Sequence, residues 1–189
     1  MINTIKPYGR WEKICGKGRI LPAFPGAGGC IEGGILDAQL LPRAIQPTTF
    51  GEIGGRKSSR EEALAYIFRK SHIPYQIVPE MHHWQISHLG VIIPLADAYY
   101  QSRHPEKICA NEKLMTLTAY RMKKNLKWIA QKGMLCPAKL YMIKDMPTGM
   151  LAGVLSRVYQ SEFGNRFLYR HAMHAPCLLY TSDAADDTP

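Results

Sequence analysis

The sequence lacks the patterns that mark membrane-spanning, secreted and zinc-binding proteins. No uninterrupted apolar run approaches the ~20 residues that a transmembrane helix needs. There is also no N-terminal apolar segment of signal-peptide length. The five cysteines lie far apart without a CxxC pair, which excludes a disulfide scaffold and favours free thiols in a reducing compartment. The sequence therefore predicts a cytoplasmic protein with no membrane partner.

Acidic residues are scarce relative to basic ones. The chain has 24 Lys and Arg against 15 Asp and Glu, a net charge of +9, which suits nucleic acid, an anionic surface or a phosphorylated ligand. The main basic run, between Arg121 and Lys127, is interrupted by apolar residues at helical spacing, and no nucleic-acid-binding motif accompanies it. We interpret the run as the solvated face of a helix and predict no nucleic-acid partner. Binding of nucleic acid through the basic surface ranks last among our hypotheses.

The first part of the chain has the pattern of a small α/β domain. Residues 19–24 predict a short strand, and the nine residues 26–34 include five glycines, which predicts a tight loop that exposes backbone N–H groups. Two extended segments follow between residues 43 and 55. A helix is then predicted from Ser58 or Ser59 to about Lys70, because each serine has Glu three positions later, as in a capping box. A strand over 75–78 completes the α/β order.

Beyond Pro79 the pattern is helical. Pro94 is expected to bend or divide the first of the predicted helices. The change of pattern predicts an α/β domain over 1–79 and a helical domain over 80–176. Residues 177–189 match no element and resemble a translated sequencing adapter, so we expect an artefact tail there. The predicted helices span residues 81–103, 107–132, 147–163 and 167–175.

Two groups of residues are candidates for chemistry. Gly26 and Gly28 begin a GxG, but Ile31 stands where GxGxxG needs its last glycine, so the pyrophosphate fingerprint is absent and a simple turn is the alternative. Trp84 and His88 are four residues apart on a helix, and histidine exchanges protons near neutral pH. The alternative for His88 is a hydrogen-bonded core residue.

No metal site is predicted. The histidines at 82, 83 and 88 lack the pair four residues apart and the added carboxylate of a helical zinc site. His171 and His174 are three apart and could act as ligands, but we interpret them as surface or interface residues.

Four segments occur in an order that resembles the ketopantoate reductase family, over about residues 20–175. The resemblance implies the C-terminal remnant of a Rossmann-type α/β domain followed by an all-α helical domain. It also implies NADP as cofactor, a 2-keto acid as substrate, and a place in pantothenate biosynthesis; it allows a homodimer through the helical domain. The segments are FPGAGG (24–29), IQPTTFGEIGGR (45–56), MHHWQISH (81–88) and IPLADAYY (93–100).

The same resemblance implies roles for particular residues. The glycine-rich segment is expected near the nicotinamide and the substrate, and the helix that begins with residues 84–94 is expected to line the active cleft, so Trp84 and His88 are the predicted substrate-binding residues. The catalytic role of His88 is our own hypothesis, because Ile86 replaces the family's lysine. The expected cofactor-binding residues are Pro25, Gly26, Ala27, Gly28 and Gly29.

The sequence departs from the family in three features. Ile86 stands where the family has a lysine that can donate to the keto oxygen. The GxGxxG half and the acidic residue of a late helix are expected to be lost by truncation. We therefore expect that this polypeptide does not reduce ketopantoate, whereas its full-length parent reduces a 2-keto acid with His88 as proton donor. The alternative is a non-catalytic ligand-binding protein of the same fold.

Overall fold

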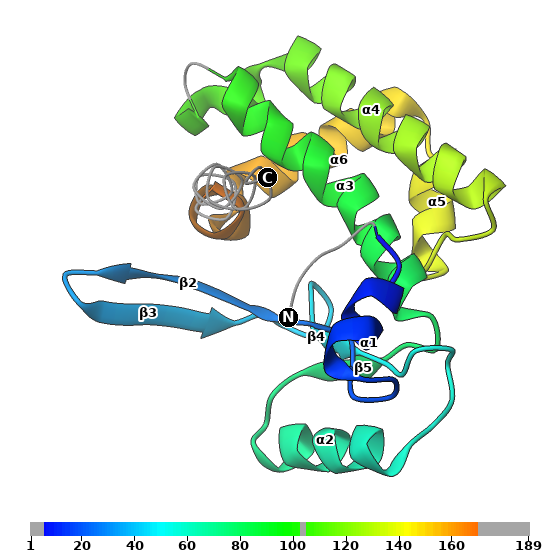
Figure 1. Ribbon diagram of the computed structural model, residues 1–189. Coiled ribbons are helices and arrows are strands. Elements are labelled where there is room, and N and C mark those ends of the chain that lie inside the picture. The colour runs from blue at the N-terminus through cyan, green and yellow to red at the C-terminus, as the bar shows by residue number, and fades with distance from the viewer. Residues whose placement is uncertain (1–5, 103–104, 170–189) are drawn as a thin grey trace, which may run out of the picture. The chain divides into compact units, whose positions relative to one another are not determined.

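The computed structural model describes residues 6–102 and 105–169. The chain is a mixed α/β protein that divides into two compact units (Figure 1). Of the described residues, the first unit contains 6–89 and 129–137, and the second contains 90–102, 105–128 and 138–169. Within the described part of the chain, no helix is both long and apolar enough to cross a bilayer.

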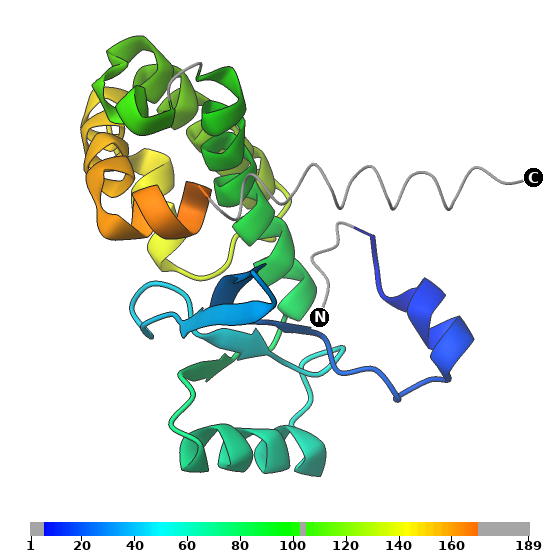
Figure 2. The same cartoon turned by 90° about the vertical axis from the view of Figure 1, so that its left-hand side faces the viewer.

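The first unit contains a three-stranded sheet with the order β1-β4-β5. Strand β4 (Thr48–Phe50) pairs antiparallel with β1 (Ala23–Phe24) and parallel with β5 (Tyr75–Ile77). Parallel neighbours need a crossover, and helix α2 (Ser59–Lys70) provides it; Figure 2 shows α2 running beside the sheet. Phe50 is fully buried and contacts the Phe68 and Tyr75 rings at centroid distances of 5.6 and 6.0 Å. The predicted α/β character of this part is confirmed.

A β-hairpin replaces the glycine-rich loop that the sequence predicts. Strand β2 (Ala27–Glu32) pairs antiparallel with β3 (Ile35–Leu40), and the hairpin extends away from the sheet (Figure 1). Only Gly33 and Gly34 form the turn, with φ of 58° and 80°, the left-handed backbone that a two-residue hairpin turn requires. The prediction of one loop over 26–34 is wrong, because the residues on either side of this turn, 27–32 and 35–40, pair with each other as two antiparallel strands.

Helix α2 begins at a hydrogen-bonded network around Glu52. The Ser58 hydroxyl accepts from the Glu61 N–H at 3.2 Å, which confirms the predicted N-cap. The same hydroxyl donates to the Glu52 carboxylate, and Arg60 donates to Glu52 through Nε at 2.7 Å and through Nη2. Arg60 also donates to the carbonyls of Gly18 and Ile20, at 2.7 and 2.9 Å. The network therefore joins three segments of the first unit.

We expect Glu52→Gln to lower the free energy of unfolding at neutral pH by about 2 kcal/mol, since it weakens charge-assisted hydrogen bonds to a buried carboxylate. The Arg60 hydrogen bonds hold the pKa of Glu52 below its usual range. A lowered folded-state pKa stabilises the fold above the unfolded value of about 4.3, and this stabilisation is lost as the pH falls through the folded value.

Urea unfolding at a series of pH values measures this effect. The native chain and the variant should differ at neutral pH and converge in acid. The control is Glu62→Gln, which removes the same charge from an exposed position in α2 and should change stability by no more than about 0.5 kcal/mol. Equal losses in both variants would contradict a specific role for the Glu52 network.

A short helix precedes the sheet. Helix α1 (Gly9–Cys15) has no buried residue. Tyr8, just before it, donates its hydroxyl proton to Gln85 Oε1 at 2.6 Å and meets the His82 ring edge-on at 5.6 Å. These contacts join the start of the described chain to the first turns of α3 (Met81–Gln101).

The described elements of the second unit are helices. The buried face of α4 (Glu112–Gln131) includes Met115, Met122 and Leu126. Tyr159 donates to the Leu95 carbonyl at 2.7 Å, and Tyr99 donates to the Gly164 carbonyl at 2.6 Å. The predicted helix over 167–175 lies mostly outside the described residues. The remaining elements are the 3₁₀ helix η1 (Pro105–Ala110), α5 (Lys139–Asp145), α6 (Thr148–Gln160) and the π-helix η2 (Phe163–Leu168).

Helix α3 continues through Pro94, so of the two predicted effects, a bend or a division, the division does not occur. Proline has no N–H, and the carbonyl four residues earlier therefore loses its helical donor. That carbonyl belongs to Gly90, and the side-chain amide of Asn125 on α4 donates to it at 3.3 Å. The hydrogen bond from Asn125 replaces the one that Pro94 removes.

Candidate functional site

Three aromatic side chains from two of the predicted segments meet in the first unit. Phe24, at the end of β1, lies 5.4 Å from the Trp84 ring and 4.5 Å from the His88 ring, measured between centroids. Trp84 and His88 are one helical turn apart on α3, and their rings stack at 5.0 Å with an interplanar angle of 9°. The structure therefore brings the FPGAGG segment and the MHHWQISH segment together.

Within the cluster Trp84 is buried, whereas His88 is more accessible to solvent. Trp84 is only 4% exposed and packs with Val78 and Met81. Phe24 and Cys136 are partly buried and pack against these three side chains. His88 is half-buried. Contacts with two rings restrict the orientation of the imidazole, and histidine carries or releases a proton near neutral pH. This arrangement can present a proton donor of fixed orientation to a small ligand.

Two groups next to this cluster were not predicted from the sequence. Ser87 is fully buried; its hydroxyl donates to the Met134 carbonyl at 3.2 Å and accepts from the Cys136 N–H at 3.0 Å. Burial, with a smaller contribution from Glu80, raises the pKa of the Cys136 thiol. A raised pKa disfavours the thiolate, so Cys136 is poorly suited to act as a nucleophile at neutral pH. The Ser87 hydroxyl joins α3 to the segment 134–136, and Cys136 packs against the cluster around Trp84.

The predicted cofactor residue Gly26 is held tightly by the fold. Its N–H donates to Thr48 Oγ1 at 3.0 Å, and its carbonyl accepts from the Leu41 N–H at 2.8 Å. A Cβ at this position would lie 2.3 Å from the Thr48 nitrogen and 2.6 Å from the Gln46 carbonyl oxygen. The close approach of these backbones explains why glycine is required here. Pro25, which is half-buried, has no N–H to offer.

The other predicted cofactor residues belong to the hairpin. Ala27, Gly28 and Gly29 pair with Leu40, Gln39 and Ala38, respectively. A Cβ at Gly29 would lie 2.1 Å from the Asp37 carbonyl oxygen, so strand pairing explains this glycine as well. Residues 27–29 are thus part of a paired strand, and the Gly26 N–H already donates to Thr48. These residues do not form a phosphate-binding loop. Their contact with NADP stays a prediction.

Ile86 does not share a helix face with His88. Successive residues of an α-helix are rotated by about 100°, so positions 86 and 88 lie about 160° apart around α3. His82 precedes Ile86 by one turn and lies on the same face, beside Tyr8. Burial, with a smaller contribution from Glu80, raises the pKa of the Tyr8 hydroxyl well above its usual range. His88 therefore cannot take the spatial position of a lysine at 86.

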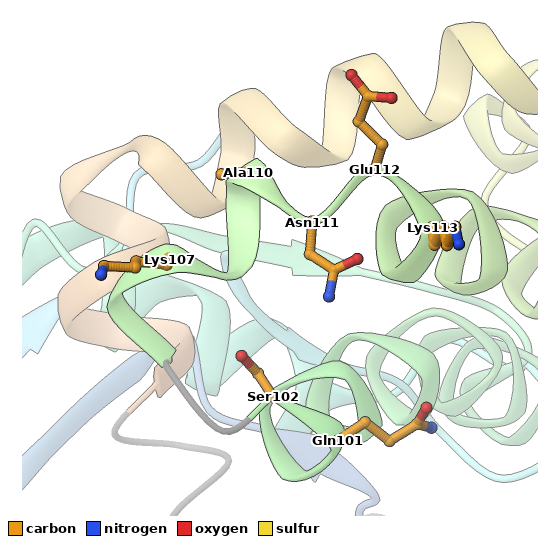
Figure 3. A pocket seen from close by; sticks show the side chains of 7 residues that line it. All are labelled: Gln101, Ser102, Lys107, Ala110, Asn111, Glu112 and Lys113. Atoms are coloured by element: carbon orange, nitrogen blue, oxygen red, sulfur yellow. The ribbon is translucent and has the colours of Figure 1, made fainter.

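An open hollow of about 780 Å³ lies in the second unit, between the end of α3 and the start of α4 (Figure 3). The Asn111 side chain points into it, with Lys107 and Lys113 on either side. Asn111 Oδ1 also accepts from the Leu114 N–H at 3.0 Å and so caps α4. No sequence motif indicated this hollow. Its lining residues are Gln101, Ser102, Lys107, Ala110, Asn111, Glu112 and Lys113.

Among residues 6–102 and 105–169, no group of three or more His, Cys, Asp or Glu side chains could hold a metal ion. His171 and His174 lie outside the described residues. Comparisons of the chain with protein-family models, with curated proteins and with solved structures give no match.

Proposed function

We propose that the chain is part of an NADPH-dependent enzyme that reduces a 2-keto acid, such as ketopantoate, to the 2-hydroxy acid. The observation that carries the proposal is the contact of Phe24 with Trp84 and His88. These residues come from two of the segments that resemble ketopantoate reductases, and their predicted roles require the segments to meet. The net charge of +9 supports an anionic substrate.

His88 supplies the proton in this proposal. Reduction of a keto group adds a hydride to the carbon and a proton to the oxygen, and a positioned acid accelerates the reaction by stabilising the developing alkoxide. The stacked contact with Trp84 fixes the imidazole plane, and half-burial leaves part of the ring accessible. The substrate then binds on the Phe24 side of α3 rather than on the side of Ile86.

The second candidate is a ligand-binding protein of the same fold without catalytic activity. The observation that favours it is Ile86, because an isoleucine neither donates a proton nor stabilises an alkoxide. His88 could replace the missing lysine as proton donor, but it lies on a different face of the helix from Ile86. Binding of a 2-keto acid without oxidation of NADPH, in a protein that includes the whole nucleotide-binding domain, distinguishes this candidate from the enzyme.

The first test is binding of ketopantoate to the chain, followed by NMR of the histidine side chains. We expect the His88 resonances to shift on titration, while those of His72 stay unchanged, because His72 is exposed after α2 and away from the aromatic cluster. Acetate, an anion that is neither substrate nor product of the proposed reaction, serves as the control ligand. Unchanged His88 resonances at saturating ketopantoate would contradict the assigned site.

A further inference from the structure

The outer face of α4 combines lysines with exposed apolar side chains. Tyr120 is 56% exposed, Trp128 is 54% exposed and Leu117 is 37% exposed. Lys113, Lys124 and Lys127 are also exposed. At about 100° per residue these six side chains occupy an arc about 100° wide, and at 1.5 Å per residue they cover about 22 Å of helix. We call this set the α4 outer stripe.

The stripe is distinct from the face of α4 that packs inside its own unit. The buried residues lie on the opposite side of the helix. Two other cations of α4 are engaged within the unit, because Arg121 pairs with Asp97 and Lys123 donates to Thr148 Oγ1 at 3.3 Å. The stripe itself contains no acidic residue. The buried side chains of α4 within the second unit are Leu114, Met115, Thr118, Ala119, Met122 and Leu126.

We propose that the α4 outer stripe binds an anionic membrane surface, with α4 lying in the plane of the lipid headgroups. Three lysines on one side of a helix complement acidic headgroups, and their long side chains can reach the phosphates while apolar neighbours enter the bilayer. Tyrosine and tryptophan favour this interface, and leucine favours the acyl region beneath it. This inference is independent of the proposed reduction of 2-keto acids.

The composition of the stripe favours lipid over nucleic acid. Tyr120 and Trp128 could stack on bases and the lysines could meet phosphates, but Leu117 would have no polar or stacking partner. Besides its lysines, the stripe's polar groups are the Tyr120 hydroxyl and the Trp128 indole N–H, and it has no Arg, Asn or Gln to read base edges in bidentate pairs. The predicted absence of a membrane partner came from the lack of a spanning segment, and a surface contact needs none.

Vesicle sedimentation with the full chain tests the proposal. We expect binding to vesicles of phosphatidylcholine with phosphatidylserine, weakening with salt, and little binding to phosphatidylcholine alone. Lys124→Gln with Lys127→Gln should lower the affinity by about 30-fold, at about fivefold per lysine. Tyr120→Ser with Trp128→Ser should lower it by roughly tenfold or more while the charge is unchanged.

The matched control is Lys57→Gln with Lys139→Gln, which removes the same charge from exposed positions outside the stripe and should retain nearly all of the binding. Circular dichroism verifies that each variant is folded. A labelled single-stranded oligonucleotide is measured in parallel. The proposal is overturned by equal losses in stripe and control variants, by binding to the oligonucleotide but not to vesicles, or by no binding to either.

Discussion

Replacement of His88 by alanine is expected to lower the rate of 2-keto acid reduction by about 10²- to 10⁴-fold, the range typical of a general acid. The assay is NADPH oxidation in a protein that combines these units with a complete nucleotide-binding domain. The reason is geometric, because Trp84 and Phe24 hold the imidazole of His88 in one orientation. The loss should appear in kcat more than in KM if His88 acts mainly on the transition state.

The matched variant is Ile86→Lys, which restores the lysine that the resemblance implies. We expect it to change the rate by no more than about threefold, since position 86 lies about 160° around α3 from His88. A large gain in Ile86→Lys, together with near-normal turnover in His88→Ala, would place the substrate on the face of His82 and Ile86 instead. The two variants therefore distinguish the two faces of one helix.

Gly51→Ala is expected to destabilise the first unit by about 3 kcal/mol or more. Gly51 follows β4, where a Cβ would lie 1.9 Å from the carbonyl oxygen of Val78 and 3.1 Å from its carbon. Both of these Val78 atoms belong to the backbone, and the Val78 N–H donates to the Phe50 carbonyl at 3.0 Å. Relief of the clash would separate β4 from the chain that follows β5, so no side-chain rotation can absorb it.

Urea unfolding followed by circular dichroism measures this loss against Gly9→Ala. Gly9 lies in the same unit, at the start of α1, where an added Cβ meets no atom within 4 Å. The control should change stability by no more than about 0.5 kcal/mol. If Gly51→Ala behaves like Gly9→Ala, the close approach of the two backbones is not a feature of the folded protein.

The sequence predicted the helices α2 and α4, whose hydrogen bonds join residues close together in the chain. The spacing of Ser58 and Glu61 predicted the start of α2, and the hydroxyl of Ser58 accepts from the Glu61 N–H. The apolar spacing of 107–132 announced α4, although its first residues form the 3₁₀ helix η1. Such signals act within a few residues along the chain, so a sequence displays them directly.

The hairpin was missed because five glycines were interpreted as one loop. The adjacent pair Gly33 and Gly34 was the signal for a two-residue turn, with six residues of strand on each side. Gly26 and Gly29 have another purpose, which is to admit backbone from the Gln46–Thr48 segment and from Asp37. A sequence shows that side chains are absent but not which distant backbone uses the space.

The candidate site was predictable only in its parts. The helical spacing of Trp84 and His88 placed the two rings on one face, and their stacking follows from it. The contact of Phe24 with both rings depends on how β1 packs against α3, which no local pattern specifies. The hydrogen bond from the Gly26 N–H to Thr48 is equally non-local, and it occupies the backbone donor that the glycine-rich sequence suggests for a ligand.

The hydrogen bond from Asn125 to Gly90 carries an evolutionary consequence. It is needed only while Pro94 leaves that carbonyl without a donor, so the two positions should be inherited together. A lineage that first exchanges Pro94 for an ordinary helix former regains the main-chain bond and can then vary Asn125 freely. The opposite order passes through an ancestor with an unsatisfied carbonyl, and selection should remove it. Relatives with proline at 94 should therefore retain an amide or another donor at 125.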